Sequence, residues 1–275
     1  TAWTALTSGT TVDLYGVYAA SASAVYIVGA SGAAYLWNGT AATAQTTGAT
    51  AAETLYGVHG SAANNVFIAS ESGKAYHWNG SAWSADTVGP RRLLGVWAGS
   101  ATRAWAVGDE GAAFEWDGTM WQIDFTLGWD SSINALWGTG VNDIWMAAGT
   151  KVYRNTGGVN WAQSAGINAA VASFGGTGPS DVWAGGVQGV YHFTGSWSGA
   201  MSIAGSVGSI VSISATATND VWFTDSQGQI FRWNGSTFRQ IDSSLNTAAV
   251  TPSYSWAADA NNVWFAGRGI TSYRR

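Results

Sequence analysis

Three histidines are the residues in this chain best suited to chemistry, because the sequence contains no cysteine. Imidazole binds metals and transfers protons near neutral pH. His77 and His192 occupy the same slot in two non-adjacent copies of a sequence repeat, and His59 stands among aromatic residues. A catalytic zinc site needs about three converging protein ligands. The sequence therefore predicts no metal site, and it assigns packing or surface roles to the histidines.

Acidic residues are the second source of chemistry. Asp109, Glu110, Glu71 and Asp225 fall in turns of the repeat. General acid–base catalysis needs two carboxylates at one substrate in differently tuned environments, and nothing in the spacing marks such a pair. The sequence also contains no Ser-His-Asp arrangement, phosphate loop or nucleotide fingerprint. We therefore expect no catalytic residues, no cofactor and a protein that is not an enzyme.

One tryptophan points to binding rather than catalysis. Trp129 is the only one of the 18 tryptophans outside the repeat pattern, and it lies beside Asp130 in the loop IDFTLGWDSS. The repeat implies no packing role for it, and loops often carry function. A planar ring beside charged groups suits a hydroxylated ligand such as a sugar, whereas the alternative is a solvated rim with the ring folded onto it. The candidate ligand-binding residues are Trp129, Asp130, Arg91, Arg92, Glu71, Lys74, Asp109 and Glu110.

These loops and turns connect copies of one repeat. The clearest copy is LLGVWAGSATRAWAVGDEGAAFEWDGTMW, from Leu93 to Trp121. Each copy places an aromatic residue after a small aliphatic one, at spacings of 38 to 42 residues. A period near 40 residues indicates one supersecondary unit stacked many times. The aromatic column consists of Tyr26, Phe67, Trp105, Trp145, Trp183, Trp222 and Trp264.

Each repeat is expected to form four short strands. In the second copy the strands cover 55–60, 66–70 and 74–78 and a last strand through Trp83. The turn before that last strand is Asn79-Gly80, which predicts a tight hairpin with positive φ at both central residues. Four antiparallel strands with glycine turns are typical of one propeller blade.

The two ends of the chain predict how the ring closes. The seventh repeat stops at Arg275, after its third strand, and the N-terminal TAWTAL matches the fourth-strand segment SAWSAD. Trp3 is therefore expected to complete blade seven. The sequence predicts an all-β, single-domain, seven-bladed β-propeller of four-stranded antiparallel blades over residues 1–275. The blades are expected at about 14–45, 55–86, 93–124, 133–164, 170–199, 210–241, and 252–275 together with 1–6.

Departures from the repeat are places where function can reside. The tryptophans on the template are expected to pack between blades, since each buries about 150–250 Å². One first-strand column, however, changes residue type strongly from copy to copy. It consists of Tyr18, His59, Trp97, Trp137, Gly175, Ser214 and Trp256.

Composition excludes several classes of partner. Charged residues make up 10% of the chain, the net charge is −5, and no basic stripe occurs, so we expect no nucleic-acid partner. No apolar run approaches the roughly 18 residues of a membrane helix, so membrane insertion is not expected. Abundant Thr, Ser, Gly and Asn with scarce Lys and Glu favours a secreted or cell-surface bacterial protein, and a monomer is expected.

The repeat resembles a bacterial β-propeller family. Its elements GVW-x-G, N-D-V-W-A-V-G and G-x-x-x-x-W-D-G-T-x-W are similar to repeats of secreted or surface proteins from myxobacteria, and they are akin to photosystem-assembly (YCF48-like) and BNR-type propellers. The Asp-box of BNR sialidases is not matched, because the spacing from Asp109 to Trp116 is wrong. WD-repeat propellers need a Trp-Asp pair in every blade, and Trp116-Asp117 is single.

The resemblance and the residues together imply a binding module. The leading hypothesis is a lectin-like propeller that binds a glycan or a protein on the face formed by the fourth-to-first-strand loops and the second-to-third-strand turns. The alternative is a protein-interaction scaffold or assembly factor of the YCF48-like kind. A hydrolase or lyase is the third and weakest hypothesis.

Overall fold

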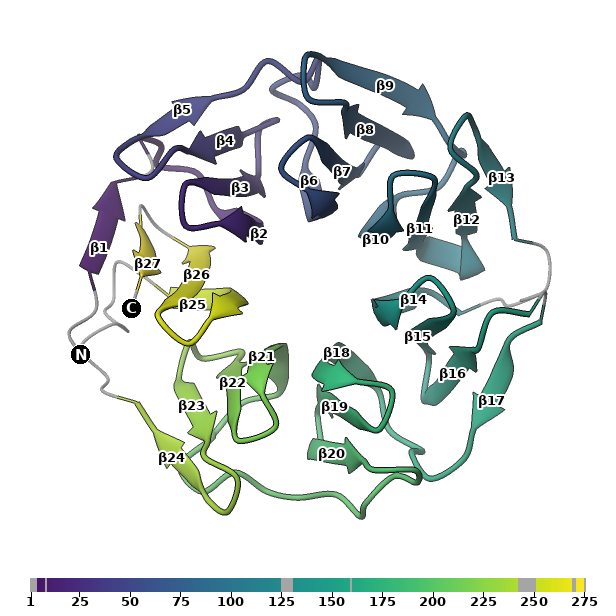
Figure 1. Cartoon of the computed structure of the whole chain (residues 1–275), viewed down its shortest axis with the longest axis vertical. Helices are drawn as coiled ribbons and strands as arrows, with labels where there is room; N and C mark the ends of the chain where they lie inside the picture. Colours follow the sequence, from purple (N-terminus) through teal and green to yellow (C-terminus); the bar gives the residue numbers. More distant parts are fainter. Residues whose placement is uncertain are drawn as a thin grey trace.

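Short antiparallel sheets stand around a central channel (Figure 1). The computed structural model describes residues 4–7, 9–124, 131–158, 160–241, 251–268 and 271–274, with the backbone alone at 4–7, 251–252, 268 and 271–274. The strands that line the channel are β2 (Leu14–Ser21), β6 (Leu55–Ala62), β10 (Leu93–Ser100), β14 (Ile133–Gly140), β18 (Val171–Gly178), β21 (Ile210–Ala217) and β25 (Thr251–Asp259).

Second and third strands follow each inner strand outward. The second strands are β3 (Ala24–Gly29), β7 (Asn65–Ser70), β11 (Arg103–Gly108), β15 (Asp143–Ala148), β19 (Asp181–Gly186), β22 (Asp220–Asp225) and β26 (Asn262–Arg268). The third strands are β4 (Ala34–Trp37), β8 (Lys74–Trp78), β12 (Ala113–Trp116), β16 (Lys151–Asn155), β20 (Gly189–Phe193), β23 (Ile230–Trp233) and β27 (Thr271–Arg274). The outer strands are β5 (Ala42–Ala44), β9 (Trp83–Thr87), β13 (Trp121–Ile123), β17 (Ala162–Ser164), β24 (Phe238–Gln240) and β1 (Thr4–Thr7).

The number of complete blades corrects the sequence prediction. The described residues form six four-stranded blades, not seven, and the sheet β18-β19-β20 has three strands. Only two isolated bridges, Phe193 with Trp197 and Val190 with Met201, follow β20. Their registers differ by one residue, which interrupts the outer strand. The edge of β20 is nevertheless paired, because the Ser198 amide donates to the His192 carbonyl at 2.9 Å.

The N-terminal strand closes the ring. β1 pairs antiparallel with β27, with Thr4 opposite Arg274 and Thr7 opposite Thr271. This is the pairing that the sequence predicts between the two ends of the chain. Trp3, which was expected to be buried there, lies outside the described residues. Without β1, strand β27 would be an unpaired edge.

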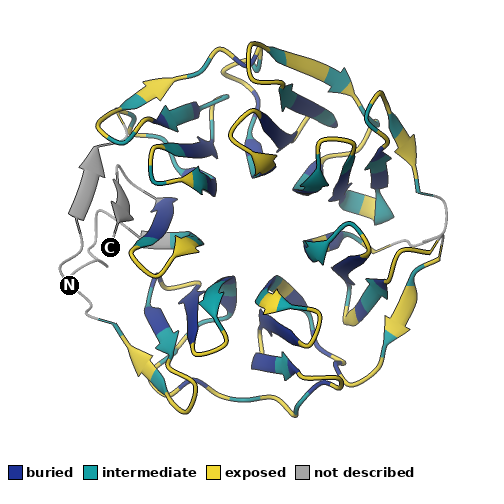
Figure 2. Ribbon diagram, viewed as in Figure 1, coloured by how far each residue is buried: buried dark blue, intermediate teal, exposed yellow. Residues whose placement is uncertain are grey.

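The hydrophobic core lies between neighbouring sheets (Figure 2). The aromatic column on the second strands is buried as predicted; Trp145, Trp183 and Trp264 are each 0% exposed. These rings contact residues of the adjacent blade: Trp145, for example, packs against Phe193 with centroids 4.9 Å apart. Each sheet therefore covers its neighbour, and no blade has a core of its own.

The turns between strands separate into two faces, as predicted. A Cβ on Gly73, between β7 and β8, would lie 2.1 Å from the Gly89 carbonyl of the loop before β10, so these segments touch on one face. On the other face, Gly80 packs against Asn64. The predicted geometry of the Asn-Gly turns is wrong in one respect. Only the glycine has positive φ, and Asn79 instead accepts hydrogen bonds through Oδ1 from the amides of Ser81 and Ala82.

A polar network recurs inside the blades. In β15, Asp143 accepts hydrogen bonds from Thr139 Oγ1 at 2.7 Å and from Arg154 Nε at 2.5 Å, and the Arg154 guanidinium lies 4.5 Å from the Trp145 ring. The network joins the end of the first strand, the second strand and the third strand of one sheet. Equivalent sets are Thr177, Asp181, His192 and Trp183; Thr216, Asp220, Arg232 and Trp222; and Ser61, Asn65, His77 and Phe67.

Deletion of residues 1–7 removes β1 and should lower the melting temperature. Each ladder hydrogen bond contributes about 1 kcal/mol, and about 2–4 °C accompanies each kcal/mol in a chain of this size. The expected fall is on the order of 5 °C or more by differential scanning calorimetry.

The matched control for this deletion moves the same residues to the other end of the chain. Joining β1 behind β27 through an Asn-Gly turn restores the pairing within one hairpin and should restore most of the lost stability. Equal melting temperatures of the parent and the deleted chain would contradict the closure.

The Asp220→Ala change tests the polar network. It leaves Arg232 and Thr216 without their acceptor in a nearly buried position, and it should cost roughly 1–3 kcal/mol in urea unfolding. Asp220→Asn is the control, since Asn65 serves in the equivalent network, and it should cost less than half as much. If both variants unfold like the parent, the network does not stabilise the blade.

Candidate functional site

The central channel contains a cavity of about 280 Å³. Its wall comes from six inner strands, which the ring closure brings together from positions far apart in the sequence. The lining includes the residues of the variable first-strand column, so the column identified in the sequence faces this space. The residues of the column that line it are His59, Trp97, Trp137, Gly175, Ser214 and Trp256.

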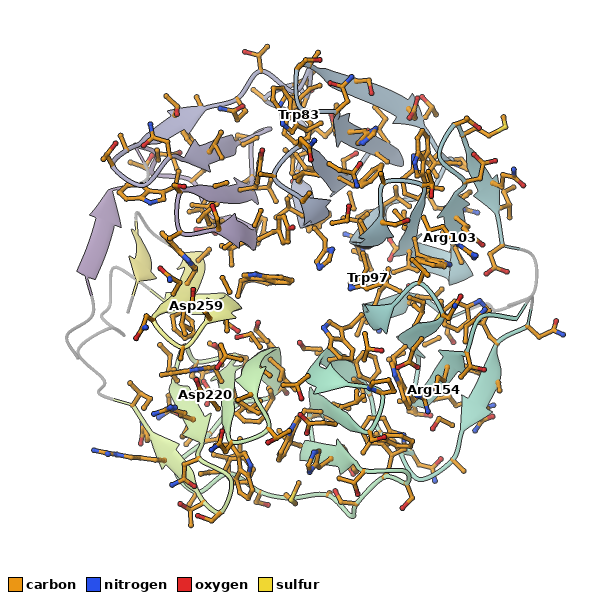
Figure 3. The ribbon with its side chains drawn as sticks, in the orientation of Figure 1. Trp83, Trp97, Arg103, Arg154, Asp220 and Asp259 are labelled. Atoms are coloured by element: carbon orange, nitrogen blue, oxygen red, sulfur yellow. The ribbon has the colours of Figure 1, made fainter. Side chains whose placement is uncertain are left out.

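Rings of the variable column form an aromatic arc on one side of the channel. Tyr18, His59, Trp97 and Trp256 are in ring contact with one another along it, and Trp137 extends this aromatic wall of the cavity beyond Trp97 without a ring contact of its own among the described residues. His59 is central to it, with ring centroids 5.0 Å from Tyr18, 5.0 Å from Trp256 and 5.6 Å from Trp97. Figure 3 shows Trp97 at the inner rim of the ring, whereas Arg154 and Asp220 lie farther out within their blades.

The opposite wall of the cavity consists mainly of small residues, together with Phe174 and Ile213. A Cβ on Gly175 would lie 2.8 Å from the Ile213 carbonyl, so the close approach of β18 and β21 requires glycine there. The nearby hydroxyls bond mainly to each other: Ser214 donates to Ser255 at 3.1 Å, and the Ser255 amide donates to Ser212 at 2.8 Å. These small side chains therefore leave space in the cavity, and the described wall that they form carries no charged group.

His59 is held in a single neutral form. The Ala98 amide donates to its Nδ1 at 3.0 Å, so the proton of the neutral ring sits on Nε2. Burial in the aromatic arc lowers the pKa of His59 to about 3, because the charged ring would lose hydration, and the Ala98 contact opposes this only in part. His59 therefore acts as a neutral hydrogen-bond donor.

The structure brings part of the predicted ligand-binding set together on the loop face. Arg91 pairs with Glu110 at 2.6 Å, and Arg92 pairs with Asp109 at 2.8 Å. These charges neutralise each other at the surface. Glu71 does not join the two pairs and accepts a hydrogen bond from the Thr54 amide at 3.3 Å.

Other members of that set form no such ion pair or lie outside the described residues. Lys74 begins β8 and makes no ion pair within the described part of the chain. Trp129 and Asp130 lie outside the described residues. The hollows described on the loop face, of about 530 and 370 Å³, are lined by other blades and include none of the predicted residues. The role of the set in ligand binding stays a prediction.

The sequence analysis did not identify the arc as a candidate site. It assigned Trp97, Trp137 and Trp256 to packing because they follow the repeat. The variable first-strand column was the signal that could have identified them, because Gly175 and Ser214 replace the aromatic residue in two copies of the repeat. Within the described ranges, no group of three His, Asp or Glu residues could hold a metal ion, and no helix is long and apolar enough to span a bilayer.

Replacement of His59 by glutamine should weaken the pH dependence of stability. The folded-state pKa of His59 lies below its usual value of about 6.5, so only the unfolded chain takes up this proton as the pH falls, and stability is lost in that direction. Between about pH 7 and about pH 5 the parent should lose roughly 2 kcal/mol that His59→Gln retains. Urea unfolding at both pH values measures this difference, and parallel losses in both proteins would refute it.

No protein-family model and no curated protein matches the sequence. Solved structures do match over nearly the whole chain. YCF48 bound to D1 peptide has a TM-score of 0.79 and 16% identity, with 99% of this chain and 96% of that chain covered. YCF48 from Cyanidioschyzon merolae has a TM-score of 0.78 and 14% identity, with 100% and 98% covered.

The WD40 β-propeller domain of Doa1 is also similar. Its TM-score is 0.81 and its identity is 12%, with 100% of this chain and 98% of that chain covered. At such low identities the likeness extends to the fold and not to a site. The chain thus has the β-propeller fold shared by YCF48 and WD40 propellers.

Proposed function

We propose that this protein is a non-catalytic β-propeller that binds a segment of a partner protein at its central channel. The observation that carries the proposal is the cavity with an aromatic arc on one side and small residues on the other. Ligand sites are typically concave and mostly apolar, with a few placed polar groups. His59 supplies such a group within the arc.

The similar structures support a protein partner. One of them is YCF48 bound to a D1 peptide, so a propeller of this shape accepts a peptide. The analogy is one of fold, because the identity is 16%. It favours protein interaction over the lectin-like role that the sequence suggested first.

A glycan is the second candidate ligand. Flat tryptophan faces such as those of Trp97 and Trp137 pack well against the apolar faces of sugar rings. The cavity of about 280 Å³ has room for little more than one such ring. A glycan array on the purified protein tests this alternative.

Selection from a random peptide display library on the immobilised protein tests the proposal. We expect a peptide consensus whose affinity for the Trp137→Ala variant falls by about tenfold or more, because a large ring that lines the cavity is removed. Fluorescence anisotropy with the consensus peptide measures the change.

The loop face provides the matched comparison. Arg91→Ala breaks the exposed pair with Glu110 and leaves the channel intact, so it should not alter peptide affinity. If Arg91→Ala abolishes binding and Trp137→Ala does not, the ligand occupies the loop face. If no peptide is enriched, protein recognition by this chain is refuted.

A further inference from the structure

Three neighbouring inner strands carry residues with ring N–H groups at equivalent positions along the channel. His59 on β6, Trp97 on β10 and Trp137 on β14 are the fifth residues of their strands. Their registers are equivalent, since each lies opposite the buried aromatic residue of its second strand. All three line the cavity. The closed ring therefore places three side chains that bear ring N–H donors on neighbouring strands of one wall.

These donors have no acceptor within the described part of the chain. Nε2 of His59 carries its proton because Nδ1 accepts the Ala98 amide, and the indole Nε1 of Trp97 and Trp137 is always a donor. The three nitrogen atoms are not among the donors that are both unpaired and fully buried, so they are not sealed from solvent. Trp256 differs from them, because its Nε1 donates to the Ala19 carbonyl at 3.1 Å.

The rest of the lining restricts the ligand further. The described wall contains no charged side chain, and His59 is neutral. A charged ligand would lose hydration without meeting an opposite charge. Ser173 and Ser214 are already bonded, to the Ile213 amide and to Ser255. A ligand that fits must be neutral, carry its own acceptors and present a flat apolar surface to the arc.

We propose that the cavity takes a planar apolar side chain of the partner segment while backbone carbonyl oxygens beside it accept hydrogen bonds from His59, Trp97 and Trp137. This inference rests on the proposed function and names the group that is recognised. A volume of about 280 Å³ suits one side chain better than an oligosaccharide, because it is at the lower end of ligand sites.

The test uses the full chain with 15N-labelled tryptophan and four small probes. N-acetyl-L-phenylalaninamide combines a ring with neutral carbonyls. N-acetyl-L-alaninamide lacks the ring, N-acetyl-L-phenylalanine adds a carboxylate, and methyl glucoside represents a sugar. The indole N–H signals of Trp97 and Trp137 are assigned from Trp97→Phe and Trp137→Phe, which keep an aromatic face but lose the donor.

We expect N-acetyl-L-phenylalaninamide to shift both indole signals and to bind more tightly than the other three probes. Each phenylalanine variant should weaken its binding by about fivefold, the effect of one neutral hydrogen bond. Trp116→Phe is the control, because Trp116 does not line the cavity and its Nε1 donates to the Ala101 carbonyl. It should leave the affinity unchanged.

Three results would overturn the inference: no shift of either signal, equal or tighter binding of methyl glucoside or N-acetyl-L-phenylalanine, or parent-like affinity in both phenylalanine variants. The broader proposal fails separately. A selected peptide that binds Trp137→Ala as well as the parent leaves protein recognition standing and refutes the cavity as its site. If N-acetyl-L-phenylalaninamide binds but no peptide is enriched in the selection, the chemistry proposed for the cavity is supported and a protein ligand is refuted.

Discussion

Packing between neighbouring sheets is the interaction on which the rest of this structure depends. Each second strand carries a ring such as Trp145 or Trp183 that is fully buried only because the next sheet covers it. A single sheet would expose these rings, so the sheets are stable only in a closed ring. Closure requires the two ends of the chain to share one sheet, which β1 and β27 achieve. The channel and its lining are consequences of that closure.

Closure also explains why the polar groups fall into two kinds. Within a blade, a buried carboxylate such as Asp143 is held by Thr139 and Arg154, so its hydrogen-bonding capacity is used by the fold. At the loop face, arginines and acidic residues pair with each other. The described channel wall carries no charged side chain that could form such pairs, and the ring N–H groups of His59 and Trp97 have no acceptor in the described structure. The channel is therefore where we propose that a ligand binds.

The asymmetry of the channel has a simple physical origin. Where β18 and β21 approach closely, only glycine fits at position 175, and the neighbouring serines bond to adjacent strands. Rings fill the equivalent positions on the other side of the channel. An exact repeat would have filled the channel evenly, so the departures from the repeat create the cavity. The aromatic residues that are proposed to contact the ligand are therefore ones that their packing alone would assign to the core.

The sequence alone determined the repeat, the strand order, the buried aromatic column and the pairing of the chain ends, because these follow from local periodicity and from turn residues such as Gly80. It could not determine that the fourth strand after β20 is broken, since the one-residue slip between Trp197 and Met201 depends on register in three dimensions. Nor could it show that Trp97 lines a cavity whereas Trp105, which lies opposite it in the sheet, does not. Only ring closure decides which face of an inner strand meets solvent and which residues from distant repeats meet there.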